Sequence, residues 1–189
     1  MKRMMILIAV SMMTGLYVYA EGDKPAAESK KEAQAQTTSP ATVQADIEKH
    51  KTCSYCGMDR EQYAYSRMLI VNEDGTESGV CCIHCAAVDF ANNLDKVFKS
   101  IQVGDYNTRK LIDAENAFWV IGGSKSGVMT KRAKWAFEGK AEAEDFVKNF
   151  GGNLATFEEA MKASYEDMYA DTKMIRERRK MKRLKALEK

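Results

Sequence analysis

Five cysteines in two groups carry the clearest chemical signal in the sequence. Cys53 and Cys56 form one C-x-x-C pair, and Cys82 and Cys85 form another, which Cys81 directly precedes. A C-x-x-C turn directs two sulfurs to one point, and two such turns can complete a tetrahedral thiolate shell around a metal ion. The spacing therefore predicts a metal site formed by Cys53, Cys56, Cys82 and Cys85.

Three kinds of chemistry fit this cysteine set. Structural zinc would be fully coordinated by four thiolates. Thiol-disulfide exchange suits an oxidising compartment, although no thioredoxin-like strand precedes Cys53. Cu(I) is a soft ion that prefers thiolate, thioether and imidazole donors, and Met58, two residues after Cys56, places a thioether beside a thiolate. We favour Cu(I), with a zinc-stabilised interaction module and a redox protein as the alternatives.

Three more residues are candidate ligands. His84 lies between Cys82 and Cys85 and either caps the following helix or contributes to the site. Cys81 alternates with Cys82 along an extended segment, so we expect it to face the opposite side as a buried thiol, although it can replace Cys82 as a ligand. Met129 is either a core methionine or a thioether brought to the site by the second half of the chain.

Enzyme signatures are not found in the sequence. It contains no Ser-His-Asp set and no paired carboxylates in a motif. The glycines Gly122 and Gly123 precede Ser124 and Lys125 but lack the spacing of a phosphate-binding loop. We therefore expect a binding protein rather than an enzyme.

The N-terminus predicts export to the periplasm. A short basic start precedes an apolar run over residues 4–16, and small residues, Val18 and Ala20, occupy the −3 and −1 positions of a signal-peptidase site. We expect residues 1–20 to be a signal peptide. Because no cysteine precedes Cys53, we do not expect a lipoprotein.

Composition and charge divide the chain after residue 20 into a linker, a domain and a tail. Cleavage would leave 27 basic and 27 acidic residues, a balance that gives no reason to expect nucleic-acid binding. Residues 21–51 are polar and predict a disordered linker with a weak helix near residues 43–51, which leaves 52–165 for the metal-binding domain. The tail at 166–189 predicts a basic helix, because residues 171–189 hold nine basic and three acidic side chains, and at most weak association with a membrane surface is expected.

The pattern of the folded part predicts an α+β domain built from two ββαβ units. In the first half, Asp74-Gly75 is typical of a hairpin turn between two apolar strands. In the second half, a glycine-rich segment separates the strands and Gly151-Gly152 ends a helix. The expected strands and helices are 66–71, 78–82, 86–98 and 101–106, then 117–121, 127–129 resuming at 133–137, 141–150 and 153–157. From residue 157 to its end the chain is expected to be helical.

The motif Cys53-x-x-Cys56-Gly57-Met58 resembles the C-x-x-C-G-M signature of the NosL family, copper-binding accessory proteins of nitrous oxide reductase maturation. The resemblance covers about residues 52–160. It implies a duplicated ββαβ fold, Cu(I) binding and delivery to a copper enzyme such as nitrous oxide reductase or to another carrier, and ligation by Cys56 and Met58. The second cysteine group and the basic tail lie outside the family's motif.

Overall fold

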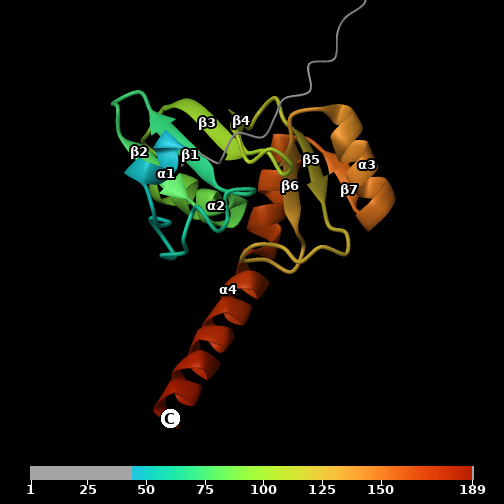
Figure 1. Ribbon diagram of the computed structural model, residues 1–189. Coiled ribbons are helices and arrows are strands. Elements are labelled where there is room, and N and C mark those ends of the chain that lie inside the picture. The colour runs from blue at the N-terminus through green and yellow to red at the C-terminus, as the bar shows by residue number, and fades with distance from the viewer. Residues whose placement is uncertain (1–43, 189) are drawn as a thin grey trace, which may run out of the picture. The chain divides into compact units, whose positions relative to one another are not determined.

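The computed structural model describes residues 44–188, so the expected signal peptide and most of the expected linker lie outside them. Two successive units of two strands, a helix and a further strand make up most of this part, and a long helix follows (Figure 1). The predicted α+β fold of two ββαβ units is confirmed.

The first unit is a four-stranded antiparallel sheet with the order β2-β1-β3-β4. A short helix precedes it, and β4 is a strand that the sequence pattern did not predict. Its elements are α1 (Ala45–Lys49), β1 (Met68–Asn72), β2 (Glu77–Val80), α2 (Ile83–Asn92), β3 (Phe98–Gly104) and β4 (Leu111–Asp113).

The second unit repeats this arrangement. Its antiparallel sheet has the order β6-β5-β7, so that in each unit the first strand is central and the second and third strands flank it. Buried residues of both units form one continuous hydrophobic core. The elements are β5 (Phe118–Ile121), β6 (Lys134–Phe137), α3 (Lys140–Phe150), β7 (Asn153–Ala155) and α4 (Phe157–Leu187).

The strand expected at residues 127–129 is wrong, and β6 alone forms the return strand. Met129 has a φ of 61°, in the left-handed region, which is incompatible with a strand. A side chain on Gly127 would lie 2.9 Å from the Cα of Ala133, so the chain is too tightly turned there to pair with β5. The segment is therefore a loop between the two strands.

The folded region begins earlier than residue 52, the start expected from composition. Helix α1 lies within the segment assigned to the linker, and its Ile47 is buried. The Asp46 carboxylate pairs with the fully buried side chains of Arg60, at 2.9 Å, and Arg67, at 2.8 Å. Composition could not reveal this, because the two partner arginines are distant in sequence.

Helix α4 confirms the helix predicted from residue 157 onward, and it is continuous across residue 165, where the basic tail was expected to begin. Thr156 and Glu159 form a capping box at its N-terminus. Its first half packs against α2 and β5, and its buried residues extend to Asp171. Within residues 44–188 no helix is both long enough and apolar enough to cross a membrane.

Candidate metal centre

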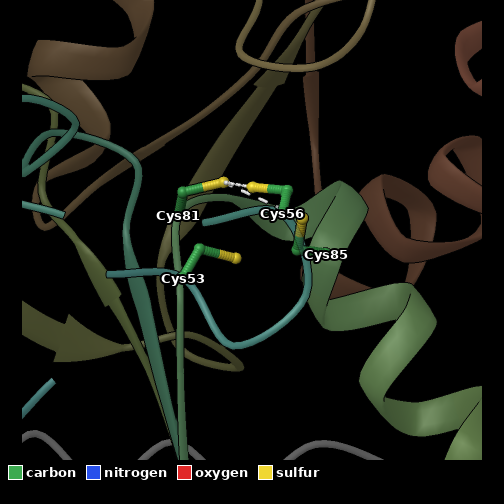
Figure 2. A group of neighbouring side chains, drawn as sticks. All are labelled: Cys53, Cys56, Cys81 and Cys85. Carbon is green, nitrogen blue, oxygen red and sulfur yellow. Dashed lines mark hydrogen bonds between the residues drawn. The ribbon is translucent and has the colours of Figure 1, made fainter. Parts of the chain in front are cut away.

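Four cysteine sulfurs, those of Cys53, Cys56, Cys81 and Cys85, lie within 4.8 Å of one another and could hold one metal ion. In Figure 2 the side chains of Cys56 and Cys81 point toward each other, and their sulfurs are 3.4 Å apart. All five cysteines are free thiols. The structure thus joins the two sequence motifs in one cluster.

The loop that carries the first two cysteines is fixed at its base and at its tip. The amide of Cys53 donates to the carbonyl of Met58 at 2.8 Å, which closes the turn, and Gly57 supplies the positive φ of 74° that the turn requires. Both the amide and the hydroxyl of Ser54 donate to the carbonyl of Gly79 on β2. At the tip, the Tyr55 hydroxyl donates to Asp89 of α2 at 2.7 Å. Burial, together with this carboxylate, raises the pKa of Tyr55 to about 12.

The cluster differs from the predicted one at a single position, because Cys81 belongs to it and Cys82 does not. The Cys82 sulfur lies 3.7 Å from that of Cys81 but outside the group of four. The reason is visible at Gly79, where a side chain would meet the Cβ of His50 at 2.5 Å. The loop of residues 50–60 crosses that face of β2, and Cys81, two residues further along, shares the face with Gly79.

Cys82 has a different role, because it is the residue that precedes α2. Its backbone is extended, with φ −170° and ψ 171°, and its carbonyl accepts from the amide of Ala86. Cys85 lies in the first turn of α2, where no acidic residue competes with a thiolate for the exposed N–H groups. The start of α2 therefore presents Cys85 to the cluster while it turns Cys82 away.

Contacts between the closely packed sulfurs shift the pKa values of the thiols in opposite directions. Contact with Cys56, and then with Cys81 and Cys85, lowers the pKa of Cys53 well below its ordinary value. The pKa of Cys56 is also lowered, because contacts with Cys81 and Cys85 outweigh the opposing effect of Cys53. Contacts with Cys53 and Cys56 raise the pKa of both Cys81 and Cys85. The contacts thus shift the pKa values of the first C-x-x-C pair downward and those of Cys81 and Cys85 upward.

A buried positive charge supports these thiolates. Two guanidinium groups, Arg60 and Arg67, share the single carboxylate of Asp46, so the trio carries one net positive charge. Burial lowers the pKa of Arg60, and the charges of Asp46 and Cys53 act in the opposite direction. Arg60 also donates to the carbonyl of Val80, the residue before Cys81.

One member of the cluster is less buried than the other three, and two methionines line a cavity nearby in the same loop region. Cys53, Cys81 and Cys85 are 0–3% exposed, whereas Cys56 is only half-buried. Met58 and Met129, both half-buried, line one cavity of about 290 Å³ together with residues of α4. The strained backbone of Met129 holds its side chain in this place, and such strain often marks a functional position.

His84 is buried, with 4% of its surface exposed, and is not a member of the group of four. Its Nδ1 lies 3.7 Å from the Asp171 carboxylate of α4, and neither of these two atoms has a hydrogen-bond partner among the described residues. The histidine therefore connects the start of α2 to α4.

Two contacts of the site were missed by sequence reasoning. The Arg179 side chain of α4 donates to the carbonyl of Cys56 at 3.2 Å, across 123 positions of sequence. Tyr55 lies inside the C-x-x-C motif and was treated as a spacer, although it holds the loop against α2. No local pattern indicates the first contact, whereas an aromatic residue inside a short loop was a usable signal for the second.

Comparison with known proteins agrees with this arrangement. The family model NosL matches residues 44–165, which is more than half of the chain. The chain belongs to the NosL family. The matched region begins at the segment before α1, as the described structure does, and it contains both cysteine groups of this NosL protein.

Two relatives of this NosL protein can be named. The HTH-type transcriptional repressor CutR of Bacillus subtilis (strain 168) is 30% identical over 121 residues, which are 64% of this chain. The chain spans about 60% of the length of that repressor. The crystal structure of the copper chaperone NosL from Shewanella denitrificans is 23% identical, with a TM-score of 0.49, over 64% of this chain and 96% of that chain.

Proposed function

We propose that this protein binds one Cu(I) ion in the periplasm and passes it to a copper enzyme, such as nitrous oxide reductase, or to another copper carrier. The observation that carries the proposal is the group of four sulfurs within 4.8 Å, whose half-exposed member, Cys56, lies beside Met58 in the loop. Thiolates and thioethers are the donors that Cu(I) prefers. Membership of the NosL family agrees with a metal-binding accessory role rather than catalysis.

Charge favours Cu(I) held mainly by the first C-x-x-C pair. Two thiolates and one Cu(I) leave a single negative charge, which the buried positive charge of Arg60, Arg67 and Asp46 can offset. Four thiolates around one Cu(I) would leave three negative charges in a largely buried place, at a high desolvation cost. The other sulfurs can then act as reserve donors while the ion enters or leaves.

Release requires an accessible edge, and Cys56 and Met58 provide it. An acceptor thiolate or thioether can approach from the cavity that Met58 and Met129 line. The acceptor would bond to the ion while Cys56 and Met58 let go, so that copper is never free in solution. We propose that Met129, which lines the same cavity as Met58, holds the ion during this exchange.

Metal analysis and competition test the proposal. Protein purified without oxygen should contain about one copper per chain and should compete with a Cu(I) chelator. Cys56→Ser and Met58→Leu should each weaken Cu(I) binding without unfolding the domain. Met174→Leu, a half-buried methionine of α4 that lines none of the cavities described here, is the matched control. Unchanged affinity in both site variants would disprove the assignment.

Zinc is the second candidate, and the same group of four sulfurs favours it. Four thiolates satisfy a tetrahedral Zn²⁺ ion completely, and such a closed site would stabilise an interaction module rather than deliver metal. One zinc per chain, together with folding lost on chelation, would support this reading. Metal-free protein with a reversible disulfide between the nearest sulfurs, Cys56 and Cys81, would instead support redox chemistry.

Export is a separate part of the proposal. The basic start, the apolar run and the small residues Val18 and Ala20 support cleavage after Ala20. Mass spectrometry of the protein from a periplasmic extract should find Glu21 at the N-terminus. Recovery of the uncleaved chain in the membrane fraction after a high-salt wash would contradict a soluble periplasmic protein with at most weak membrane association.

A further inference from the structure

The C-terminal half of α4 forms a strongly cationic surface, and binding of a metal ion by the cysteines does not require it. Residues 173–187 contain eight basic side chains and one acidic side chain. All eight basic residues are exposed, and none takes part in an ion pair within residues 44–188. The positive charge of this half is therefore available to another molecule.

The first half of the same helix differs. There, Asp167 pairs with Arg132 at 2.9 Å and with Lys134 at 2.5 Å, and Glu166 also pairs with Arg132. Charge is thus compensated where α4 packs on the domain and uncompensated where it extends beyond Asp171. The contrast shows that the cationic character belongs to one segment and not to the helix as a whole.

One residue of this segment contacts the cysteine loop. Arg179 donates to the carbonyl of Cys56 at 3.2 Å. Arg178 and Arg179 line the same cavity as Met58 and Met129. A neighbouring cavity of about 240 Å³ continues along the helix, and Arg179 lines both. The cationic surface and the exposed edge of the cysteine cluster are therefore parts of one continuous face.

We propose that residues 173–187 are the docking surface for an acidic protein that receives the metal ion from the cysteine cluster. This proposal rests on the proposed function, because a docking surface at the mouth of the site has a purpose only if the ion leaves. Complementary charge would bring the acceptor to α4 and orient its donor atoms toward Cys56.

The distribution of side chains favours a protein partner over a membrane. A helix that lies on a lipid surface needs a wide apolar face opposite its charges. Here the basic residues cover most of the helix circumference. The sector without them holds only two exposed large apolar residues, Met181 and Leu184, whereas Leu187 lies among the basic residues. A partner that takes copper must also reach Cys56, and Arg179 of the cationic surface contacts that residue.

The transfer itself is a ligand exchange without a change of oxidation state. The acceptor's thiols lose their protons as their sulfurs bond to Cu(I). The bonds from copper to Cys53, Cys56 and Met58 break, and the released sulfurs of Cys53 and Cys56 can take up the two protons. No oxidant or reductant is needed.

Stopped-flow transfer to a synthetic acceptor tests the docking surface. Full-length protein loaded with Cu(I) is mixed with a C-x-x-C peptide flanked by glutamates, and separately with the same peptide carrying glutamines. At about 0.01 M salt, where the screening length is about 30 Å, we expect transfer to the acidic peptide to be faster by about tenfold or more. At about 1 M salt, where the screening length is about 3 Å, this advantage should disappear.

Two charge variants show whether α4 is responsible. The tail variant carries Lys180→Gln, Lys182→Gln, Arg183→Gln and Lys185→Gln, and the control variant carries Lys99→Gln, Lys110→Gln, Lys148→Gln and Lys162→Gln. Both lose the same charge, and glutamine keeps helix propensity. The tail variant should lose the preference for the acidic peptide, and the control variant should keep it. Circular dichroism and chelator competition should find both folded, with unchanged Cu(I) affinity.

The outcomes separate the two proposals. A chain that binds no Cu(I) would refute the proposed function. Normal Cu(I) binding with equal transfer rates to both peptides, or equal effects of the two variants, would refute the docking surface and leave copper binding intact. Binding to phosphatidylglycerol vesicles or duplex DNA that is lost in the tail variant, without any preference for the acidic peptide, would also overturn it.

Discussion

At the scale of residues, Cys81 and Cys82 show how far the sequence could lead. The two motifs and their metal-binding chemistry could be predicted from spacing, but which of two adjacent cysteines faces the loop could not. That choice depends on the loop crossing β2 at Gly79, where a side chain would collide with His50. The absence of a side chain two positions before Cys81 was the only local hint.

This pair yields the first prediction. Cys81→Ser should weaken Cu(I) binding by about 10- to 100-fold or more, since even partners outside a coordination shell can contribute that much. Cys82→Ser, the matched control, should have a clearly smaller effect because its sulfur lies outside the group of four. Competition with a Cu(I) chelator measures both. Equal losses would place Cys82 in the site, as the spacing alone suggested.

Asp46 gives the second prediction. Its side chain is 6% exposed and is the shared partner of two fully buried guanidinium groups, so Asp46→Asn leaves those charges uncompensated. We expect a loss of about 3–5 kcal/mol in the free energy of unfolding, measured with urea. Glu48→Gln, on the same helix but exposed, should change it little. A small effect of Asp46→Asn would mean that water already reaches the pair.

Acid should act through the same carboxylate. Burial disfavours its charge, but hydrogen bonds and charge from Arg67 and Arg60 outweigh burial and hold the pKa of Asp46 below 3.8. A lowered folded-state pKa adds stability at pH above the unfolded value, and this stability is lost as pH falls through the folded value. The destabilisation by Asp46→Asn should therefore be constant between about pH 5 and 7 and shrink below about pH 4. A difference that did not depend on pH would contradict the assigned pKa direction.

At the scale of elements, hairpins and helices were more predictable than loops and ends. Asp74-Gly75 placed the first hairpin correctly, because the turn needs the positive φ that Gly75 adopts. The loop at residues 127–129 was predicted as a strand, since its apolar residues gave no sign of the left-handed backbone at Met129. Helix α1 was expected only as a weak helix within the linker, because its stabilising partners, Arg60 and Arg67, lie outside its own segment.

Helix α4 should tolerate loss of its second half. Its buried residues end at Asp171, so a chain ending at Thr172 should fold and lose only about 1 kcal/mol, the typical contribution of the single hydrogen bond from Arg179 to Cys56. A chain ending at Thr156 exposes the core that Phe157, Ala160 and Met161 cover, and it should not fold. Thermal melting of the two shortened chains measures both effects. Unfolding of the longer chain would mean that residues beyond Thr172 belong to the core.

At the scale of the whole molecule, the two units have the same topology but different chemistry. All five cysteines lie in or just before the first unit, whereas the second contributes Met129 and the helix that reaches the site. Duplication could be predicted from the order of apolar segments. The different contributions of the two units to the site could not be predicted, because they depend on how α4 packs against the first unit.

The folded region should extend back to Gln44. A chain beginning at Gln44 should fold, whereas one beginning at Thr52 should be unfolded or insoluble, because it lacks the carboxylate of Asp46 and the buried Ile47. Circular dichroism and gel filtration of the two chains measure this. Equal folding would show that α1 is dispensable and that the domain starts where composition first placed it.

The shared ion pair also has a mechanical consequence. Asp46 holds Arg60, and Arg60 in turn holds the carbonyl of Val80, directly before Cys81. A force applied to the chain at residue 44 thus acts on the end of β2, directly before Cys81, as well as on the loop of Cys53 and Cys56. When the protein is immobilised for a force experiment, a handle at residue 44 should strain the cluster before it unravels α3, which has no such link to that end.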